Sequence, residues 1–218
     1  MNIMSAEYGH LVRKGIIMAE SNTKHQKLII EAAVKLFREY GYENVSVNDI
    51  CKEAEVARST FYLNFAGKKE IINKILSDAR LDREDFFGDF VAAANDFERM
   101  WILCNRYLTV AINFGPELTG ALFRLELLGE VDVMDTTHKV DEWMIQLCRN
   151  AQKAGIILHP EPAEIIAPIG VDIAYYTTYE WCKRKGDFNI RQVVREREEA
   201  MYNLAPGCRM SDTELAKL

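Results

Sequence analysis

Histidine and cysteine side chains could bind a metal ion or carry out redox chemistry, but their spacing favours neither. The 218-residue chain holds four His and five Cys, widely separated and without a C-x-x-C pair. Structural zinc sites typically use closely spaced pairs, and disulfide frameworks use an even, patterned set. The glycine signatures of nucleotide-binding loops and of serine hydrolases are also missing from the sequence. We therefore expect no metal, no cofactor and no enzymatic activity.

Two cysteines lie within apolar stripes of the sequence. Cys104 and Cys148 each sit among hydrophobic residues at helical spacing. A thiol in such a place is usually an inert core residue, whereas a redox sensor needs a lowered thiol pKa and access to solvent. Both interpretations are open from the sequence alone.

One short segment carries side chains that are suited to binding a polyanion. Arg58, Ser59, Thr60 and Tyr62 lie within five residues of one another. An arginine can bond both acceptors of a guanine edge, or it can lie on a phosphate or in solvent. Hydroxyl groups bond phosphate oxygens, which fixes position without reading sequence. Such contacts require a rigid element that presents these side chains together.

The elements predicted around this segment are helices. Apolar residues recur at i, i+3, i+4 and i+7 from Ile29 to Tyr40, which predicts an amphipathic helix ended by Gly41. Ser46, with Asp49 three residues later, predicts the capped start of a second helix. The first four predicted helices span residues 24–40, 47–54, 57–63 and a stretch from 68 past 76. Because the second and third are short and separated by two residues, they predict a helix-turn-helix.

Residues 24–76 resemble the DNA-binding domain of the TetR family of bacterial transcriptional regulators. The matching residues are Ile29, Ile30, Ala32, Ala33, Leu36, Phe37, Gly41, Tyr42, Ser46, Val47, Ile50, Ala54, Val56, Thr60, Phe61, Tyr62, Phe65, Lys68 and Ile71. The sequence departs from the family pattern at Ser59, Asn64 and Gly67. The resemblance implies that residues 57–63 form a recognition helix, whose N-terminal side chains meet base edges in the major groove.

The resemblance also implies roles for individual residues. The predicted DNA-binding residues are Ser46, Arg58, Ser59, Thr60, Tyr62, Lys68, Lys24 and Lys27. Lys68 would bind a phosphate together with the amides that begin its helix, or it would simply be exposed. Ser46 offers a phosphate contact that competes with its capping role. Lys24 and Lys27 either add electrostatic attraction or only keep the surface soluble.

Beyond residue 76 the periodicity remains helical, so we expect an all-α protein. Further helices are predicted at residues 98–114, 117–128, 140–154, 163–185 and 190–204, with a break at Gly115 and Pro116. The apolar stripe of the last helix is expected at Val193, Val194, Arg197, Ala200, Met201 and Leu204. The expected divisions are an N-terminal extension (1–20), a helix-turn-helix domain (21–75) and a helical ligand-binding and dimerisation domain (76–210).

The charge is unevenly distributed between these parts. The net charge is -6, yet residues 21–75 hold nine Lys/Arg against seven Asp/Glu, and residues 76–218 hold sixteen against twenty-four. Such a contrast favours different partners for the two parts. Residues 1–20 sum to zero, so they are either a weak DNA-contacting arm or an extension without that role. No apolar run has the length of a signal peptide or a membrane span, and we expect a cytoplasmic protein.

The C-terminal part is rich in aromatic residues, which either pack the core or line a ligand cavity. The predicted ligand-binding residues are Trp101, Asn105, Phe114, Phe123, Trp143, Tyr175 and Tyr179, with Asn113 and Arg124 as further polar candidates. Ligand sites are mostly apolar with a few polar groups that orient the ligand. The expected effector is therefore a small, mainly apolar or aromatic molecule.

The sequence thus predicts a ligand-responsive transcriptional repressor. The family resemblance implies that the last two long helices pair with those of a second subunit, which gives a homodimer and a palindromic operator. The alternative is a DNA-binding protein of the same fold without a small-molecule ligand, whose helical bundle binds another protein.

Overall fold

The computed structural model describes residues 24–81, 84–131 and 137–215. Within these ranges the chain is helical and has no β-strand; one isolated bridge pairs Ile157 with Leu204. The predicted all-α class is confirmed. The chain divides into two compact units, with the boundary in the sequence between Leu76 and Ser77. They are called the N-terminal and the C-terminal unit below. The N-terminal extension expected at residues 1–20 lies outside the described residues.

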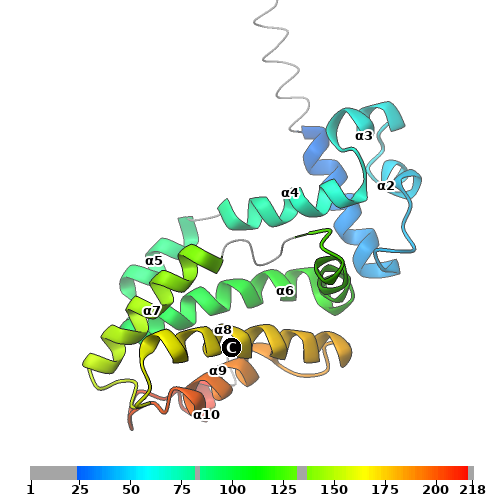
Figure 1. Cartoon of the computed structure of the whole chain (residues 1–218). Helices are drawn as coiled ribbons and strands as arrows, with labels where there is room; N and C mark the ends of the chain where they lie inside the picture. The colour runs from blue at the N-terminus through cyan, green and yellow to red at the C-terminus, as the bar shows by residue number, and fades with distance from the viewer. Residues whose placement is uncertain (1–23, 82–83, 132–136, 216–218) are drawn as a thin grey trace, which may run out of the picture. The chain divides into compact units, whose positions relative to one another are not determined.

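The N-terminal unit is built on a first helix at residues 24–40, followed by three more (Figure 1). These are α2 (Val47–Glu53), α3 (Arg58–Asn64) and α4 (Lys68–Leu81), which continues past the end of the unit. Each begins within one residue of its predicted start. The fully buried side chains that hold the four helices together are apolar: Ile29, Ala33, Phe37, Ile50, Phe61 and Ile71. Burial of such side chains is the main favourable term in folding.

The C-terminal unit contains α5 (Glu84–Ala92), α6 (Asp96–Leu127), α7 (Thr137–Lys153), α8 (Ala163–Lys183), α9 (Ile190–Met201) and α10 (Asp212–Leu215). Helix α8 packs against α6, α7 and α9, as Figure 1 shows. The break predicted within α6 is present, because Gly115 leaves helical geometry with φ 78° and ψ 165° directly before Pro116. Glycine tolerates this φ without a steric penalty. Helices α5 and α10 were not predicted.

The buried face of α9 differs from the prediction. The helix ends at Met201, three residues before its predicted end, and Asn203 follows with φ 50°. Val194 is buried as expected, but Arg197 and Ala200 are exposed. Arg195, Glu198 and Glu199 are buried instead. Apolar spacing could not predict this face because charged side chains are almost never fully buried unless they are paired.

The cysteines of the C-terminal unit behave as core residues. Cys104 and Cys148 are buried and free. Burial raises the pKa of the Cys148 thiol to about 12 and raises the pKa of the Cys104 thiol well above its ordinary value. A raised pKa keeps a thiol protonated and unreactive, so the structure favours the core role over the redox-sensor role. No helix in the described ranges is long and apolar enough to cross a membrane.

Candidate nucleic-acid interface

The exposed face of α3 carries the predicted DNA-contacting side chains. Phe61 is fully buried, and the centre of its ring lies 6.2 Å from that of Phe65, which fixes the inner face of this short helix. Arg58, Ser59 and Tyr62 are exposed, and Thr60 is half-buried. The structure therefore places the predicted reading residues together on one helix, most of them open to solvent.

Arg58 and Tyr62 are paired one turn apart. The Arg58 Nη2 atom donates to the Tyr62 hydroxyl at 3.4 Å, and its guanidinium carbon lies 5.7 Å from the centre of the Tyr62 ring. Contact with an aromatic ring restrains a guanidinium without using all five of its donors. This pairing leaves Arg58 able to bond a base edge or a phosphate, so both interpretations remain available.

Ser46 acts as a helix cap in this structure. Its hydroxyl donates to Asp49 Oδ2 at 2.5 Å and accepts from the Asp49 amide at 3.2 Å, while the Ser46 amide donates to the same carboxylate at 2.9 Å. These bonds form a complete capping box. They also lower the pKa of Asp49, which keeps this carboxylate charged. With its hydroxyl so engaged beside an anion, the structure supports the capping role of Ser46 over the phosphate contact.

Lys68 is held by a neighbour on the loop before α2. Its ammonium donates to the Tyr42 carbonyl at 2.7 Å and lies 4.5 Å from the centre of the Tyr42 ring. Partial burial lowers the pKa of Lys68. An ammonium has three donors, so a phosphate contact is compatible with this arrangement but is not displayed by it. The role of Lys68 in DNA binding stays a prediction.

The two lysines at the start of the first helix are exposed. The Lys27 ammonium lies 4.0 Å from the Glu31 carboxylate, with most of both side chains in solvent. Exposed pairs of this kind contribute little to stability. Lys24 is likewise exposed. Their position allows a loose attraction to DNA but gives no fixed contact.

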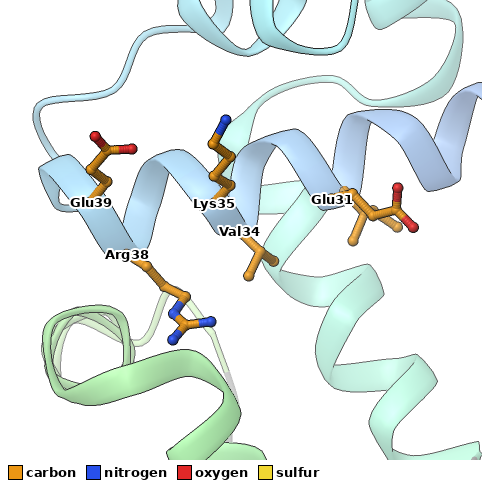
Figure 2. Close-up of a pocket in the computed structure, with 6 residues that line it drawn as sticks. Glu31, Val34, Lys35, Arg38 and Glu39 are labelled. Carbon is orange, nitrogen blue, oxygen red and sulfur yellow. The ribbon is translucent and has the colours of Figure 1, made fainter.

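A shallow groove runs along another face of the first helix. It is lined by Ile30, Glu31, Val34, Lys35, Arg38 and Glu39, and Figure 2 shows the charged side chains standing along the helix. Lys35 also binds Glu53 of α2 at 2.5 Å. Four of its six lining residues are charged, with both signs present, whereas an effector site usually has only a few polar groups.

The predicted ligand-binding residues fall into separate groups. Phe123, Tyr175 and Tyr179 lie together, with ring centroids 4.7 Å apart for Phe123–Tyr175 and 6.2 Å apart for Phe123–Tyr179. The Tyr175 hydroxyl donates to Glu126 at 2.7 Å. This group joins the second half of α6 to α8, and it keeps one polar pair within an aromatic cluster. It is the part of the predicted set that most resembles a ligand site.

The other predicted ligand-binding residues lie elsewhere. Trp101 belongs to a buried cluster with Leu108 and Val194, and Phe114 is buried. Asn105 accepts a hydrogen bond from Arg191 Nε at 2.8 Å, so its amide oxygen already has a partner. Trp143 is 57% exposed on α7. The structure therefore does not bring the seven residues into one site, and their role in ligand binding stays a prediction.

Two features of the N-terminal unit escaped the sequence analysis. Glu55, in the turn between α2 and α3, has φ 52°, a left-handed conformation that glycine adopts far more easily. Leu63, on α3, is exposed although it is a large hydrophobic residue. The tight two-residue connection between α2 and α3 is the signal that could have indicated the left-handed conformation of Glu55. Nothing in the local pattern marks Leu63.

Comparisons with known proteins agree with this architecture. Residues 29–75 match the family model for bacterial regulatory proteins of the tetR family. A helix-turn-helix of this kind, joined to a larger helical unit, defines a DNA-binding transcriptional regulator. This match confirms the predicted resemblance of the helix-turn-helix region to the TetR family. In the described residues, no group of three or more His, Cys, Asp or Glu side chains could hold a metal ion.

Three similar proteins define the extent of the likeness. The HTH-type regulator YuxN of Bacillus subtilis is 40% identical over 52 residues, which cover 24% of this chain and 18% of that protein. The HTH-type transcriptional repressor KstR of Rhodococcus jostii is 24% identical over 172 residues, 78% of each chain. The crystal structure of FadR from Bacillus subtilis, in complex with stearoyl-CoA, is 20% identical with a TM-score of 0.63. The matched region covers 81% of this chain and 97% of the FadR chain, so the shared fold extends through both units.

Proposed function

We propose that this chain is a ligand-responsive repressor that binds a palindromic operator as a homodimer and leaves it when an effector binds. The observation that carries the proposal is the exposed face of α3, on which Arg58, Ser59 and Tyr62 stand together over a buried Phe61. A recognition helix needs this division between a packed inner face and a polar outer face. The protein would act in the cytoplasm, without catalysis.

Dimerisation is supported by an exposed apolar stripe on α8. Ile165, Ile169, Tyr176 and Tyr179 are all large, exposed and separated by three, four or seven residues. Residues at these intervals lie along one side of a helix. An exposed apolar stripe on a soluble protein usually marks an interface. The family resemblance implies that this helix pairs with its copy in a second subunit, and the stripe gives that pairing an apolar surface to bury.

A dimer sets the form of the operator. Two α3 helices related by twofold symmetry would enter successive major grooves on one side of the duplex, roughly 35 Å apart. Effector binding in the C-terminal unit would act through α4, which begins in one unit and ends in the other. To dissociate most of the protein from DNA, the effector must bind the DNA-free conformation of the protein more tightly than the DNA-bound one. The difference must be about 3 kcal/mol or more.

The first effector class to test is long-chain acyl-CoA. FadR of Bacillus subtilis, which shares the fold, was crystallised with stearoyl-CoA. The cluster of Phe123, Tyr175 and Tyr179 offers apolar faces to an acyl chain, and the Glu126–Tyr175 pair offers a polar contact. Only the acyl chain of such a molecule matches the expected apolar effector, because its coenzyme A portion is large and highly charged.

The test is displacement of the protein from a fluorescent duplex taken from directly upstream of its own coding region. Stearoyl-CoA is titrated into the complex, and coenzyme A without the acyl chain serves as the matched control. We expect release with stearoyl-CoA alone, and Phe123→Ala should raise the concentration needed. Binding that no acyl-CoA alters would remove this effector class but leave the DNA-binding role intact.

The alternative function is favoured by a different observation. Trp143 on α7 and two leucines at the end of α6, Leu127 and Leu128, are all more than half exposed. Exposed tryptophan and leucine side chains are typical of sites that bind another protein. A DNA-binding regulator whose C-terminal unit binds a protein partner would keep DNA affinity in the presence of every small molecule tested.

A further inference from the structure

Leu63 stands out on α3 because it is 77% exposed. Among residues 24–76, the other exposed large hydrophobic residues are Leu28, Tyr40 and Tyr62, and all of them are covered to a greater extent. A leucine gains nothing from contact with water, and it has no polar atom that could bind a ligand group there. A partner that covers this side chain would have to offer it an apolar group.

The helix geometry places Leu63 on the DNA-facing side. Successive residues of an α-helix are rotated by about 100°, so a residue two positions away lies on nearly the opposite side. Ser59 and Leu63 each stand two positions from Phe61, the fully buried residue of α3. They share the face opposite the core, one turn apart, and Arg58 and Tyr62 lie beside them on one side of the helix.

The dimensions of the major groove allow Leu63 to reach a base. The seven residues of α3 span about 10 Å along the helix axis. The major groove is about 12 Å wide, so the whole helix fits within it. Leu63 lies only one turn, about 6 Å, beyond Ser59. A helix whose first turn contacts base edges therefore brings Leu63 to the same groove.

The major groove offers one apolar group to a leucine, the C5 methyl group of thymine. A phosphate contact is excluded for Leu63 because the side chain has no hydrogen-bond donor. We propose that Leu63 is a specificity-determining residue, which selects a T·A pair in each half-site by packing on the thymine methyl group. This inference rests on the proposed function, since it requires that α3 enters the major groove.

The test removes single thymine methyl groups from the DNA and measures the change in affinity. A pool of random 30-base-pair duplexes is first selected on the wild-type full-length protein to give a preferred site. Each thymine of that site is then changed to deoxyuridine, which lacks only the C5 methyl group. Removing one methyl contact, worth ~0.8 kcal/mol, is expected to weaken binding about fourfold at one half-site and about fifteenfold at both.

The variants decide whether Leu63 reads that methyl group. Leu63→Ala should bind the thymine and deoxyuridine duplexes equally well, whereas Leu63→Met should still distinguish them. Leu158→Ala, which shortens an exposed leucine of the C-terminal unit, should behave as wild type. Unfolding temperatures show that each variant is folded.

Two outcomes would overturn the proposal. The first is a wild-type site at which no deoxyuridine weakens binding, and the second is a methyl effect that Leu63→Ala retains. Either result would leave specific DNA binding in place and refute the role of Leu63 alone. If the wild-type protein selects no sequence from the pool, the proposed function fails together with this inference.

Discussion

The Arg195 guanidinium holds the Glu98 carboxylate with both of its terminal nitrogens, at 3.1 and 2.6 Å, inside the C-terminal unit. Arg195 is fully buried, and its Nε donates to Glu199 at 2.7 Å. The guanidinium carbon also lies 4.7 Å from the centre of the Phe97 ring and 5.2 Å from that of Trp101. This bidentate pair ties α9 to the first half of α6.

Glu98→Gln is expected to destabilise the C-terminal unit. The change removes one of the two carboxylates that face the buried Arg195 charge. Breaking one side of a buried ion pair commonly costs about 3–5 kcal/mol, because the remaining charge stays out of water. Chemical denaturation measures the loss. Glu196→Gln, an exposed change on α9, is the control and should stay within about 0.5 kcal/mol of wild type. A loss below 1 kcal/mol for Glu98→Gln would contradict the structural role of the pair.

Glu198 should make stability depend on pH. Its side chain is only 2% exposed, and burial raises its pKa from 4.5 to about 8. The folded chain therefore keeps a proton that the unfolded chain loses above pH 4.5. The resulting stability is fully present below that pH and is lost as the pH rises to about 8, by on the order of a few kcal/mol.

The Glu198→Gln variant isolates this effect, because glutamine imitates the protonated acid and cannot ionise. Wild type and variant should unfold with similar free energies near pH 5. At pH 8.5 the variant should be the more stable of the two. A difference that stays constant between these pH values would show that Glu198 does not hold the extra proton.

Glu55→Gly is expected to stabilise the N-terminal unit. Glu55 has φ 52°, and residues other than glycine pay a steric cost of about 1–2 kcal/mol in this region. The greater freedom of glycine in the unfolded chain offsets part of that gain, which leaves about 1 kcal/mol. Slower hydrogen exchange of α2 and α3 amides would reveal it. Glu55→Ala keeps a β-carbon and should show no such gain; equal gains for both variants would point to charge rather than backbone conformation.

Ile169→Glu is expected to prevent dimerisation. Ile169 lies within the exposed apolar stripe of α8, and a buried charge there would lack a partner. Sedimentation should find a dimer for the wild type and a folded monomer for the variant, with at least tenfold weaker binding to DNA. Val91→Glu, which adds the same charge at an exposed apolar residue of α5, should remain dimeric. A dimeric Ile169→Glu protein would place the interface elsewhere.

The helices could be predicted because they depend on local spacing. The apolar repeat from Ile29 to Tyr40, the Ser46–Asp49 cap and the glycine break at Gly115 all act within one or two turns, and the structure contains each of them. The DNA-contacting residues predicted on α3 came instead from their side-chain chemistry and from the family resemblance, and most of them are exposed.

The remaining features depend on residues far apart in the sequence. Lys68 bonds Tyr42, which is 26 positions away, and Asn105 bonds Arg191, which is 86 positions away. The buried Arg195 is paired with Glu98, 97 positions earlier, as well as with the nearby Glu199. A charged or polar residue is expected at the surface until such a partner is known, so the sequence could not indicate which of them are engaged.

The most direct test of the DNA-binding role is a titration with the duplex from upstream of the coding region, against an unrelated duplex, at low and moderate salt. The expected result is tight binding to the upstream duplex alone, which Arg58→Ala weakens at least tenfold through loss of a base or phosphate contact. Lys153→Ala, which removes an exposed cation of α7, should change little. Equal affinity of wild type and Arg58→Ala, or no binding to either duplex by a folded protein, would contradict the assignment of α3 as the recognition helix.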